Sequence, residues 1–268
     1  MINPPENVDE VDTDYLSKVL VKSDLRAVLY FDSIDSTNKY ARENNIPSDC
    51  LIIADEQIKG RGRFDRVWES EKGTNILLTI VKSFRIKYPA LINFYASYIV
   101  YKTLTEFYDD TVGQFALKWP NDILLGGKKI CGILTELRNI NSEEKKFYIG
   151  VGINVNQEKF SESINNKTTS LAKYFKRKSD ISDLIAHIIK NFYKNIKLAF
   201  DISILMETWR KTAKLEGKLV EFRLNDTAEA LSGVITGIKD DGGIEIEPDT
   251  MVGVKKKSIY YSGEISFI

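Results

Sequence analysis

The sequence predicts an α+β fold, in which a mixed, mostly antiparallel sheet packs with helices and a small SH3-like β-barrel follows at the C-terminal end. Between residues 115 and 153, short apolar runs alternate with Gly-rich turns, which is typical of antiparallel strands joined by hairpins. Residues 181–214 carry long stretches of apolar residues at helical spacing. The pattern changes to short strands and turns at Leu215, so we expect two domains, residues 1–214 and residues 215–268.

The N-terminal part of the chain predicts a lead-in and three strands. Residues 1–25 are polar and charged and are expected to be loosely ordered, with a short helix at their end. Apolar runs predict strands at 27–31, 51–55 and 75–84. Ser36 or Thr37 is expected to cap a short helix after the first strand, because its side-chain oxygen can accept an unpaired N–H group of the first helical turn.

The middle of the chain predicts three helical stretches and four further strands. A buried helix is expected over residues 91–107, where apolar residues recur at helical spacing. The strands are expected at 115–118, 122–125, 129–138 and 146–153, with a hairpin turn at 126–127. Asp180 is expected to cap a long amphipathic helix over residues 181–200, and a second helical stretch covers residues 202–214.

The C-terminal part predicts the barrel. Short strand-like segments are present at 217–224, 229–238, 242–248 and 255–268, and turn signals such as NDT and DDGG separate them. This many short strands in so short a segment is typical of a small SH3-like barrel.

The overall composition excludes several classes of function. Lys plus Arg and Asp plus Glu both number 38, so the chain has no general positive field that would attract nucleic acid. The two cysteines, Cys50 and Cys131, lack the spacing of a zinc site, and His187 is the only histidine. The N-terminus lacks the features of a signal peptide, and no apolar run is long enough to cross a bilayer. A cytoplasmic protein without a membrane partner is therefore expected.

One segment, GRGRFDRVW at residues 60–68, concentrates positive charge, and we call it the arginine loop. The residues of this loop that could contact a bound ligand are Gly60, Arg61, Gly62, Arg63 and Arg66. Glycines allow the backbone to approach a ligand closely, and guanidinium groups are suited to carboxylate or phosphate oxygens. Trp68 could stack on a planar ring or anchor the loop. The alternative is a solvated basic turn that pairs with Asp65 and Glu69, and the loop alone does not identify a ligand.

Three further segments carry polar groups at strand ends. In KWPNDI, Lys118 precedes Asn121 and Asp122, a set suited to phosphate and metal contacts, although an ordinary Pro-Asn-Asp turn is an equal alternative. In KKICGILTE, Lys128 and Lys129 alternate faces, so that only one of them can point into a site. Solvated lysines are the leading alternative unless neighbouring residues supply a pocket.

Small and amide residues follow these lysines. Gly132 is expected to leave room for a ligand beside Lys129. In GVGINVN, Asn154 and Asn156 lie on the same side of an extended segment and could bond a ribose or a phosphate, or could be turn residues. Neither a Rossmann fingerprint nor a P-loop is present.

The order of these motifs resembles the catalytic domain of biotin protein ligases, also called biotin–acetyl-CoA-carboxylase synthetases. SIDSTN, EQIKGRGRFDRVW, KWPND, GKKICGIL and GVGINVN follow one another over residues 30–156. The resemblance implies a class II synthetase-like catalytic domain and a C-terminal barrel. It also implies that the protein makes biotinyl-5′-AMP from biotin and MgATP, and then transfers biotin to a lysine of a biotin carboxyl carrier protein. Some thirty residues precede SIDSTN, so the similarity is to family members without a DNA-binding domain, and no DNA partner is expected. A homodimer is among the expected assemblies.

The resemblance assigns roles to individual residues. Those expected to contact biotin are Ser36, Thr37, Asn38, Gln57, Gly60, Arg61, Gly62, Arg63, Lys129 and Gly132. Those expected to face the nucleotide are Arg66, Trp68, Lys118, Asn121, Asp122 and Asn154. Lys129 and Arg63 are the expected catalytic residues, as electrostatic stabilisers, and Asp122 is the expected contact of the Mg²⁺ that ATP carries. Glu264 near the C-terminus also matches the family.

Three alternatives remain open at this point. A lipoate–protein ligase shares the fold and the adenylate chemistry, but is expected to lack the arginine loop. A biotin-binding sensor without catalysis would need the residues that face the biotin ring, but neither Lys129 nor the KWPND segment. A plain structural role leaves all four polar segments unexplained.

Overall fold

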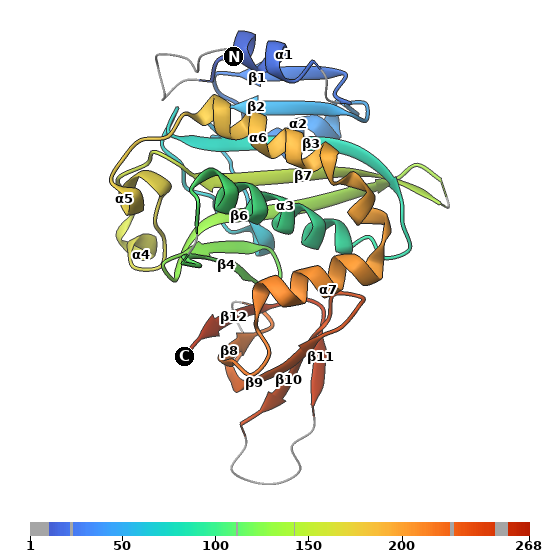
Figure 1. The fold of residues 1–268 in the computed structure, drawn as a ribbon, viewed down its shortest axis with the longest axis vertical. Helices are drawn as coiled ribbons and strands as arrows, with labels where there is room; N and C mark the ends of the chain where they lie inside the picture. Colours follow the sequence, from blue (N-terminus) through green and yellow to red (C-terminus); the bar gives the residue numbers. More distant parts are fainter. Residues whose placement is uncertain (1–10, 22–23, 111, 142, 226–227, 250–256) are drawn as a thin grey trace.

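The computed structural model describes residues 11–21, 24–110, 112–141, 143–225, 228–249 and 257–268, and within these ranges the chain forms a seven-stranded and a five-stranded sheet (Figure 1). The predicted lead-in at residues 1–10 and the start of the last predicted barrel segment, at 255–256, lie outside the described residues.

The larger sheet has the strand order β1-β2-β3-β7-β6-β5-β4. Its strands are β1 (Ala27–Phe31), β2 (Cys50–Ala54), β3 (Asn75–Arg85), β4 (Phe115–Lys118), β5 (Asp122–Leu125), β6 (Lys128–Asn139) and β7 (Glu144–Asn154). Only the pairing of β1 with β2 is parallel among these described strands, so the sheet is mixed and mostly antiparallel as predicted. Gly126 and Gly127 both have positive φ and form the predicted hairpin turn between β5 and β6.

Helices cover both faces of this sheet. The α-helices are α1 (Thr13–Val19), α2 (Thr37–Glu43), α3 (Leu91–Phe107), α4 (Glu162–Asn165), α5 (Leu171–Phe175), α6 (Ile181–Lys194) and α7 (Ile202–Ala213), and the 3₁₀ turns are η1 (Arg63–Asp65) and η2 (Ile196–Phe200). In Figure 1, α3 and α6 lie across the front face of the sheet and α2 lies behind it. Ser36 caps α2 and Asp180 caps α6, each accepting from a backbone N–H of the first turn, as predicted.

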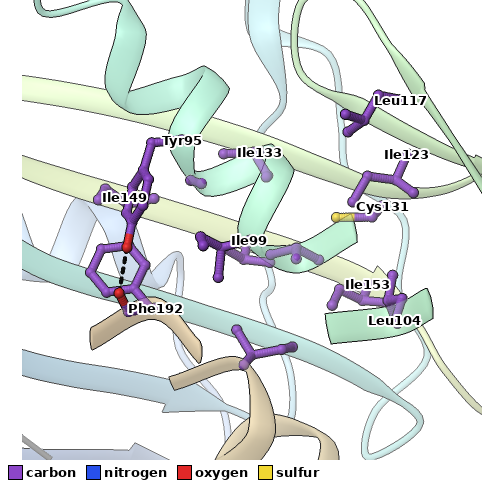
Figure 2. Packing of buried hydrophobic residues seen from close by; sticks show 14 of the residues in the cluster. Tyr95, Ile99, Leu104, Leu117, Ile123, Cys131, Ile133, Ile149, Ile153 and Phe192 are labelled. Atoms are coloured by element: carbon purple, nitrogen blue, oxygen red, sulfur yellow. Dashed lines mark hydrogen bonds between the residues drawn. The ribbon is translucent and has the colours of Figure 1, made fainter. Parts of the chain in front are cut away.

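The main core lies between the sheet and α3. Figure 2 shows Tyr95 and Ile99 of α3 against Ile133 of β6 and Ile149 of β7. The Tyr95 hydroxyl donates to the backbone carbonyl of Phe192 on α6, so that the one polar atom of this ring is satisfied inside the core. The fully buried apolar faces of these strands keep the sheet edges and loops that carry polar groups in fixed positions.

The structure differs from the predicted helices in two places. The expected helix 181–200 ends at Lys194, and the chain continues from Ile196 as the 3₁₀ turn η2, so the prediction of one helix was wrong. The helices α4 and α5 were not predicted, because segments of four and five residues are too short to show a helical period. Within the expected lead-in, α1 docks on α6: the backbone N–H of Asp12 donates to Ser182 Oγ at 2.7 Å.

The smaller sheet has the order β11-β10-β9-β8-β12 and is antiparallel. Its strands are β8 (Leu219–Arg223), β9 (Leu231–Ile238), β10 (Ile244–Pro248), β11 (Ser258–Tyr260) and β12 (Glu264–Phe267). Trp119 Nε1 donates to the Gly242 carbonyl at 3.0 Å and ties this sheet to the end of β4. The domain boundary at 214/215 falls between α7 and β8 and stays a prediction. None of the helices in the described ranges has the length and apolar character needed to cross a bilayer.

Candidate active site

The polar motifs of the sequence meet in a cavity of about 800 Å³ between the larger sheet, the arginine loop and the smaller sheet. Fifteen of the sixteen predicted site residues line it: Ser36, Thr37, Asn38, Gln57, Arg61, Gly62, Arg63, Arg66, Trp68, Lys118, Asn121, Asp122, Lys129, Gly132 and Asn154. Gly60 is the exception. Its missing side chain leaves the space against the backbone oxygen of Trp68, which a Cβ would approach to 3.0 Å, so Gly60 lets the two ends of the loop close.

The cavity has an excess of positive charge. The cationic residues in its lining are Arg61, Arg63, Arg66, Lys118, Lys129, Lys167 and Arg223, and the anionic ones are Glu69, Asp122, Glu221 and Glu264. Because seven cations face four anions in a chain of zero net charge, the positive charge is local to this site. Such a site is suited to an anionic ligand.

The arginine loop is a closed hairpin. Trp68 N–H donates to the Gly60 carbonyl at 3.0 Å, and Gly62 N–H donates to the Arg66 carbonyl at 2.7 Å. At its tip, Phe64 and Asp65 have φ values of 58° and 56°, a left-handed backbone that is costly for residues with a side chain. The loop therefore has a defined shape, held by its own backbone bonds.

Arg63 points from this loop to the smaller sheet. Its NH1 donates to the Gly263 carbonyl at 3.1 Å and to Asn121 Oδ1 at 3.4 Å, and its NH2 donates to Ser262 Oγ at 3.2 Å. Burial lowers the pKa of the guanidinium, while the charges of Asp122 and Glu264 act to raise it. By contrast, Arg61 is solvent-exposed and lies 3.6 Å from Asp65, which is the pairing that the solvated-turn alternative expected for this one arginine.

Asp122 lies between two lysines on neighbouring strands. Lys129 Nζ lies 2.7 Å from Asp122 Oδ1, and Lys118 Nζ lies 3.9 Å from Asp122 Oδ2. Lys118 also donates to Glu264 Oε1 at 3.4 Å, and Arg66 forms an ion pair with the other oxygen of Glu264. The two carboxylates thus hold the ends of three cationic side chains beside one another in the cavity.

A β-bulge in β6 brings Lys129 and Gly132 to the cavity face. Lys129 pairs with Leu124, but Cys131 pairs with Ile123, so Ile130 is the extra residue of β6. Ile130 and Cys131 both turn into the core, whereas strict alternation would place Lys129 and Gly132 on opposite faces. The backbone of Lys129 exchanges hydrogen bonds of 2.9 and 3.0 Å with residues 167–169, which pair with the strand at this point.

Trp68 lies on the floor of the cavity, over two glycines that are partners across β6 and β7. A Cβ on Gly152 would lie 2.7 Å from Trp68 Cε2, and a Cβ on Gly132 would lie 3.0 Å from Trp68 Cζ3. The Lys129 ammonium lies 5.7 Å from the centre of the indole ring. The room that Gly132 was expected to leave for a ligand is thus filled by Trp68 in this structure, and the ring anchors the arginine loop to the sheet.

The N-terminus of α2 forms the other end of the cavity. Thr37 N–H donates to Gln57 Oε1 at 2.8 Å, and Thr37 Oγ1 lies 3.1 Å from the same oxygen. Behind them lie Thr79 of β3 and Glu136 of β6, which the sequence analysis missed. The only signal for Thr79 was a hydroxyl inside the otherwise apolar run NILLTIV.

Asn154, the last residue of β7, and Asn156, just after it, have different environments. Asn154 Nδ2 donates to the Thr169 carbonyl at 3.1 Å, and its buried Oδ1 has no hydrogen-bond partner among the described residues. Asn156 accepts from Ser179 N–H and donates to the Ser179 carbonyl, and it does not line the cavity. Of the two alternatives that the sequence left open for Asn156, the structure therefore favours a role in the local backbone over a ligand contact.

The donor set around Asp122 does not form a metal site made by the protein alone. Both of its oxygens face lysine ammonium groups, which compete with a cation for the same lone pairs. In the part of the chain that the structure describes, no group of three His, Cys, Asp or Glu side chains is placed to hold a metal ion.

Replacing Glu264 by Gln is expected to lower the melting temperature at neutral pH, and the difference should disappear in acid. Burial acts to raise the pKa of Glu264, but the hydrogen bond from Arg66 and the charges of Lys118, Arg66 and Lys129 together lower it. A carboxyl group whose pKa is lowered in the folded state stabilises the protein at pH values above its unfolded-state pKa of about 4.3. This stabilisation is lost as the pH falls through the folded-state pKa. Thermal unfolding from neutral to acid pH measures the difference, with Glu229→Gln, an exposed carboxyl in the segment that precedes β9, as control. A difference that persists in acid would contradict the ion-pair explanation.

Comparisons with known proteins agree with this arrangement. The model of the Biotin/lipoate A/B protein ligase family matches residues 30–154. The bifunctional ligase/repressor BirA of Bacillus spizizenii is 32% identical over 274 residues, which cover 99% of this chain and 81% of that protein. This chain belongs to the biotin/lipoate A/B protein ligase family.

Two further members of the ligase family extend the comparison. The biotin–[acetyl-CoA-carboxylase] ligase of Paracoccus denitrificans is 32% identical over 126 residues, 45% of this chain and 51% of that protein. The solved structure of the biotin protein ligase from Aquifex aeolicus in complex with biotin and ATP has a TM-score of 0.73 and 24% identity, over 91% of this chain and 99% of that chain. Its likeness confirms the predicted fold class, with the ligase-type α+β sheet and the C-terminal SH3-like sheet.

Proposed function

We propose that this protein is a biotin protein ligase, which activates biotin with MgATP to biotinyl-5′-AMP and transfers the biotin to a lysine of a biotin carboxyl carrier protein. The observation that carries the proposal is the position of Lys129, which the β6 bulge turns into a cationic cavity beneath the arginine loop. The names of the relatives support it, because the Paracoccus denitrificans relative is a biotin ligase and the Aquifex aeolicus relative was solved with biotin and ATP.

The first step joins two anions. A carboxylate oxygen of biotin forms a bond to the α-phosphorus of ATP, while the bond from that phosphorus to the pyrophosphate oxygen breaks and its electron pair leaves with pyrophosphate. Because a carboxylate is already deprotonated, this step needs positive charge at the junction and no general base. Lys129 is assigned to this junction, where Asp122 holds its ammonium group at 2.7 Å. Lys118 and Arg66 are assigned to the nucleotide phosphates.

The second step releases AMP. The amine of the carrier lysine attacks the biotinyl carbonyl carbon, the bond from that carbon to the AMP oxygen breaks, and the amine loses a proton to solvent. The role of the arginine loop is to retain the adenylate between the two steps. Arg63 contributes to this role through its bonds to residues 262 and 263, which connect β11 to β12 of the smaller sheet.

Several further properties of the protein stay predictions from the sequence. These are the Mg²⁺ ion carried by ATP beside Asp122, the absence of DNA binding, assembly as a homodimer and a cytoplasmic location. The individual roles of the site residues belong to the same group, and the experiments below test several of them.

Pyrophosphate–ATP exchange with purified protein, run separately with biotin and with lipoate, tests the function. Lipoate is included because the family model covers lipoate ligases as well. We expect exchange with biotin alone, followed by transfer to an isolated carboxyl-carrier domain. Exchange with lipoate alone would reverse the substrate assignment, and biotin binding without any exchange would indicate a sensor.

A further inference from the structure

A series of hydrogen bonds runs from the surface into the protein behind the residues expected to contact biotin. Its members, in order from the surface to the cavity, are Arg42, Glu136, Asn38, Thr79, Thr37 and Gln57. Thr79 has no exposed surface and Asn38 is 5% exposed, and neither Thr79 nor Glu136 lines the cavity. Which side chain donates and which accepts in each of these hydrogen bonds follows from the donor and acceptor atoms that each residue carries.

The amide of Asn38 has one allowed orientation. Its Nδ2 lies 3.0 Å from Glu136 Oε2 and 3.1 Å from the Leu134 carbonyl, and both oxygens can only accept. A reversed amide would place an oxygen against both of them. Arg42 pairs with the other oxygen of Glu136 and holds the carboxylate in place. The Oδ1 atom of Asn38 must therefore face Thr79.

This orientation fixes the direction of two hydroxyl protons. Thr79 Oγ1 lies 2.6 Å from Asn38 Oδ1 and 2.8 Å from Thr37 Oγ1. Because Asn38 Oδ1 only accepts, the single proton of Thr79 goes to it, and none remains for Thr37. The proton of Thr37 then goes to one of two acceptors within the protein, Thr79 Oγ1 at 2.8 Å or Gln57 Oε1 at 3.1 Å. Toward the cavity, the Thr37 oxygen is left as an acceptor.

Gln57 supplies the opposite polarity. Its Oε1 accepts from the Thr37 N–H at 2.8 Å, so its Nε2 is left to donate. An acceptor beside a donor complements an N–H group beside a carbonyl, as in the cyclic urea of biotin. The dithiolane ring of lipoate offers neither group and would leave both unpaired, which a polar site disfavours.

We propose that Asn38 and Thr79 are positioning residues, which select a cyclic-urea ligand by fixing Thr37 as an acceptor for a ligand N–H. This assignment rests on the proposed function and deepens it. It also changes the role expected for Asn38, because the amide groups of Asn38 are engaged by the protein itself. Asn38 acts on the ligand through Thr79 and Thr37.

A double-mutant cycle tests the proposal. Thr37→Val, Thr79→Val and the double variant are titrated with biotin in the absence of ATP by calorimetry. We expect each single variant to raise the Kd for biotin by about tenfold, the size of one lost hydrogen bond. The double variant should also raise it by about tenfold, because Thr79 acts through Thr37, whereas independent contributions would multiply to about a hundredfold.

Companion variants separate positioning from folding. Thr79→Ser keeps the hydroxyl and should restore the wild-type Kd, and Thr79→Ala serves the cycle if the valine variant does not fold. Thr103→Val removes another buried hydroxyl, one that bonds the Ile99 carbonyl in α3 at 2.8 Å, and should lower stability without changing the Kd for biotin. The KM for ATP is expected to stay unchanged in the Thr79 variants.

The outcomes distinguish failure of the proposed function from failure of the positioning role. If the wild type neither binds biotin nor catalyses biotin-dependent exchange, the proposed function fails. If the wild type does both, but Thr79→Val leaves the Kd unchanged or its effect multiplies with that of Thr37→Val, the positioning role alone is overturned.

Discussion

Replacing Lys129 by Met is expected to reduce biotin-dependent pyrophosphate–ATP exchange by about 10²- to 10³-fold, the typical effect of losing one transition-state charge donor. Lys129 Nζ is the cationic group nearest to Asp122, at 2.7 Å, and lies over the indole of Trp68 on the cavity floor. Exclusion of water strengthens a charge at this position. Methionine keeps the length of the chain over Trp68 and Gly132 but removes the charge, so the loss should fall on the chemical step.

Lys128 offers a matched control for this experiment. It stands next to Lys129 but is exposed on the other side of the strand, so Lys128→Met should exchange pyrophosphate like the wild type. Lys129→Arg keeps the positive charge and serves if the methionine variant is unstable, because the charge of the buried Asp122 then remains compensated. Circular dichroism and thermal unfolding establish that each variant is folded. A folded Lys129→Met protein with normal exchange would exclude the assigned role.

The fold was predictable from sequence because most of its signals are local. Gly126 and Gly127 form the expected hairpin because their positive φ values suit glycine, and the caps Ser36 and Asp180 satisfy first-turn N–H groups within three residues. The break at Asn195 has no comparable signal. The apolar spacing of the segment continues through it, and packing decides where the helix ends.

The site was predicted less completely, because its geometry depends on contacts between distant segments. The alternation of a regular strand cannot place Lys129 and Gly132 on one face, and only the bulge at Ile130 does so. The bonds from the arginine loop to the smaller sheet join residues about two hundred positions apart, such as Arg63 and Gly263. Motif spacing identified the residues that meet in the cavity, but not their partners.

Replacing Arg63 by Gly is expected to let the adenylate escape into solution, while adenylation itself continues. Arg63 ties the arginine loop to Gly263 and Ser262, in the connection between β11 and β12, at 3.1 and 3.2 Å. Two hydrogen bonds of about 1 kcal/mol each correspond to escape that is about 10- to 100-fold faster. The reactive anhydride should then biotinylate lysines of an unrelated bystander protein. Retention of radiolabelled adenylate through gel filtration measures the escape directly.

The contrast between the two variants locates the two roles. Lys129→Met should lose pyrophosphate–ATP exchange, whereas Arg63→Gly should keep this exchange but no longer retain the adenylate. The reason is that Arg63 bonds Gly263, while Lys129 pairs with Asp122 beside Trp68 on the cavity floor. Arg85→Gly, at the exposed far end of β3, controls for the loss of an arginine and should retain the adenylate like the wild type. If Arg63→Gly retained the adenylate unchanged, its bonds to the smaller sheet would serve the folded structure rather than the closed state of the arginine loop. If it lost exchange instead, Arg63 would act at the reacting phosphate together with Lys129.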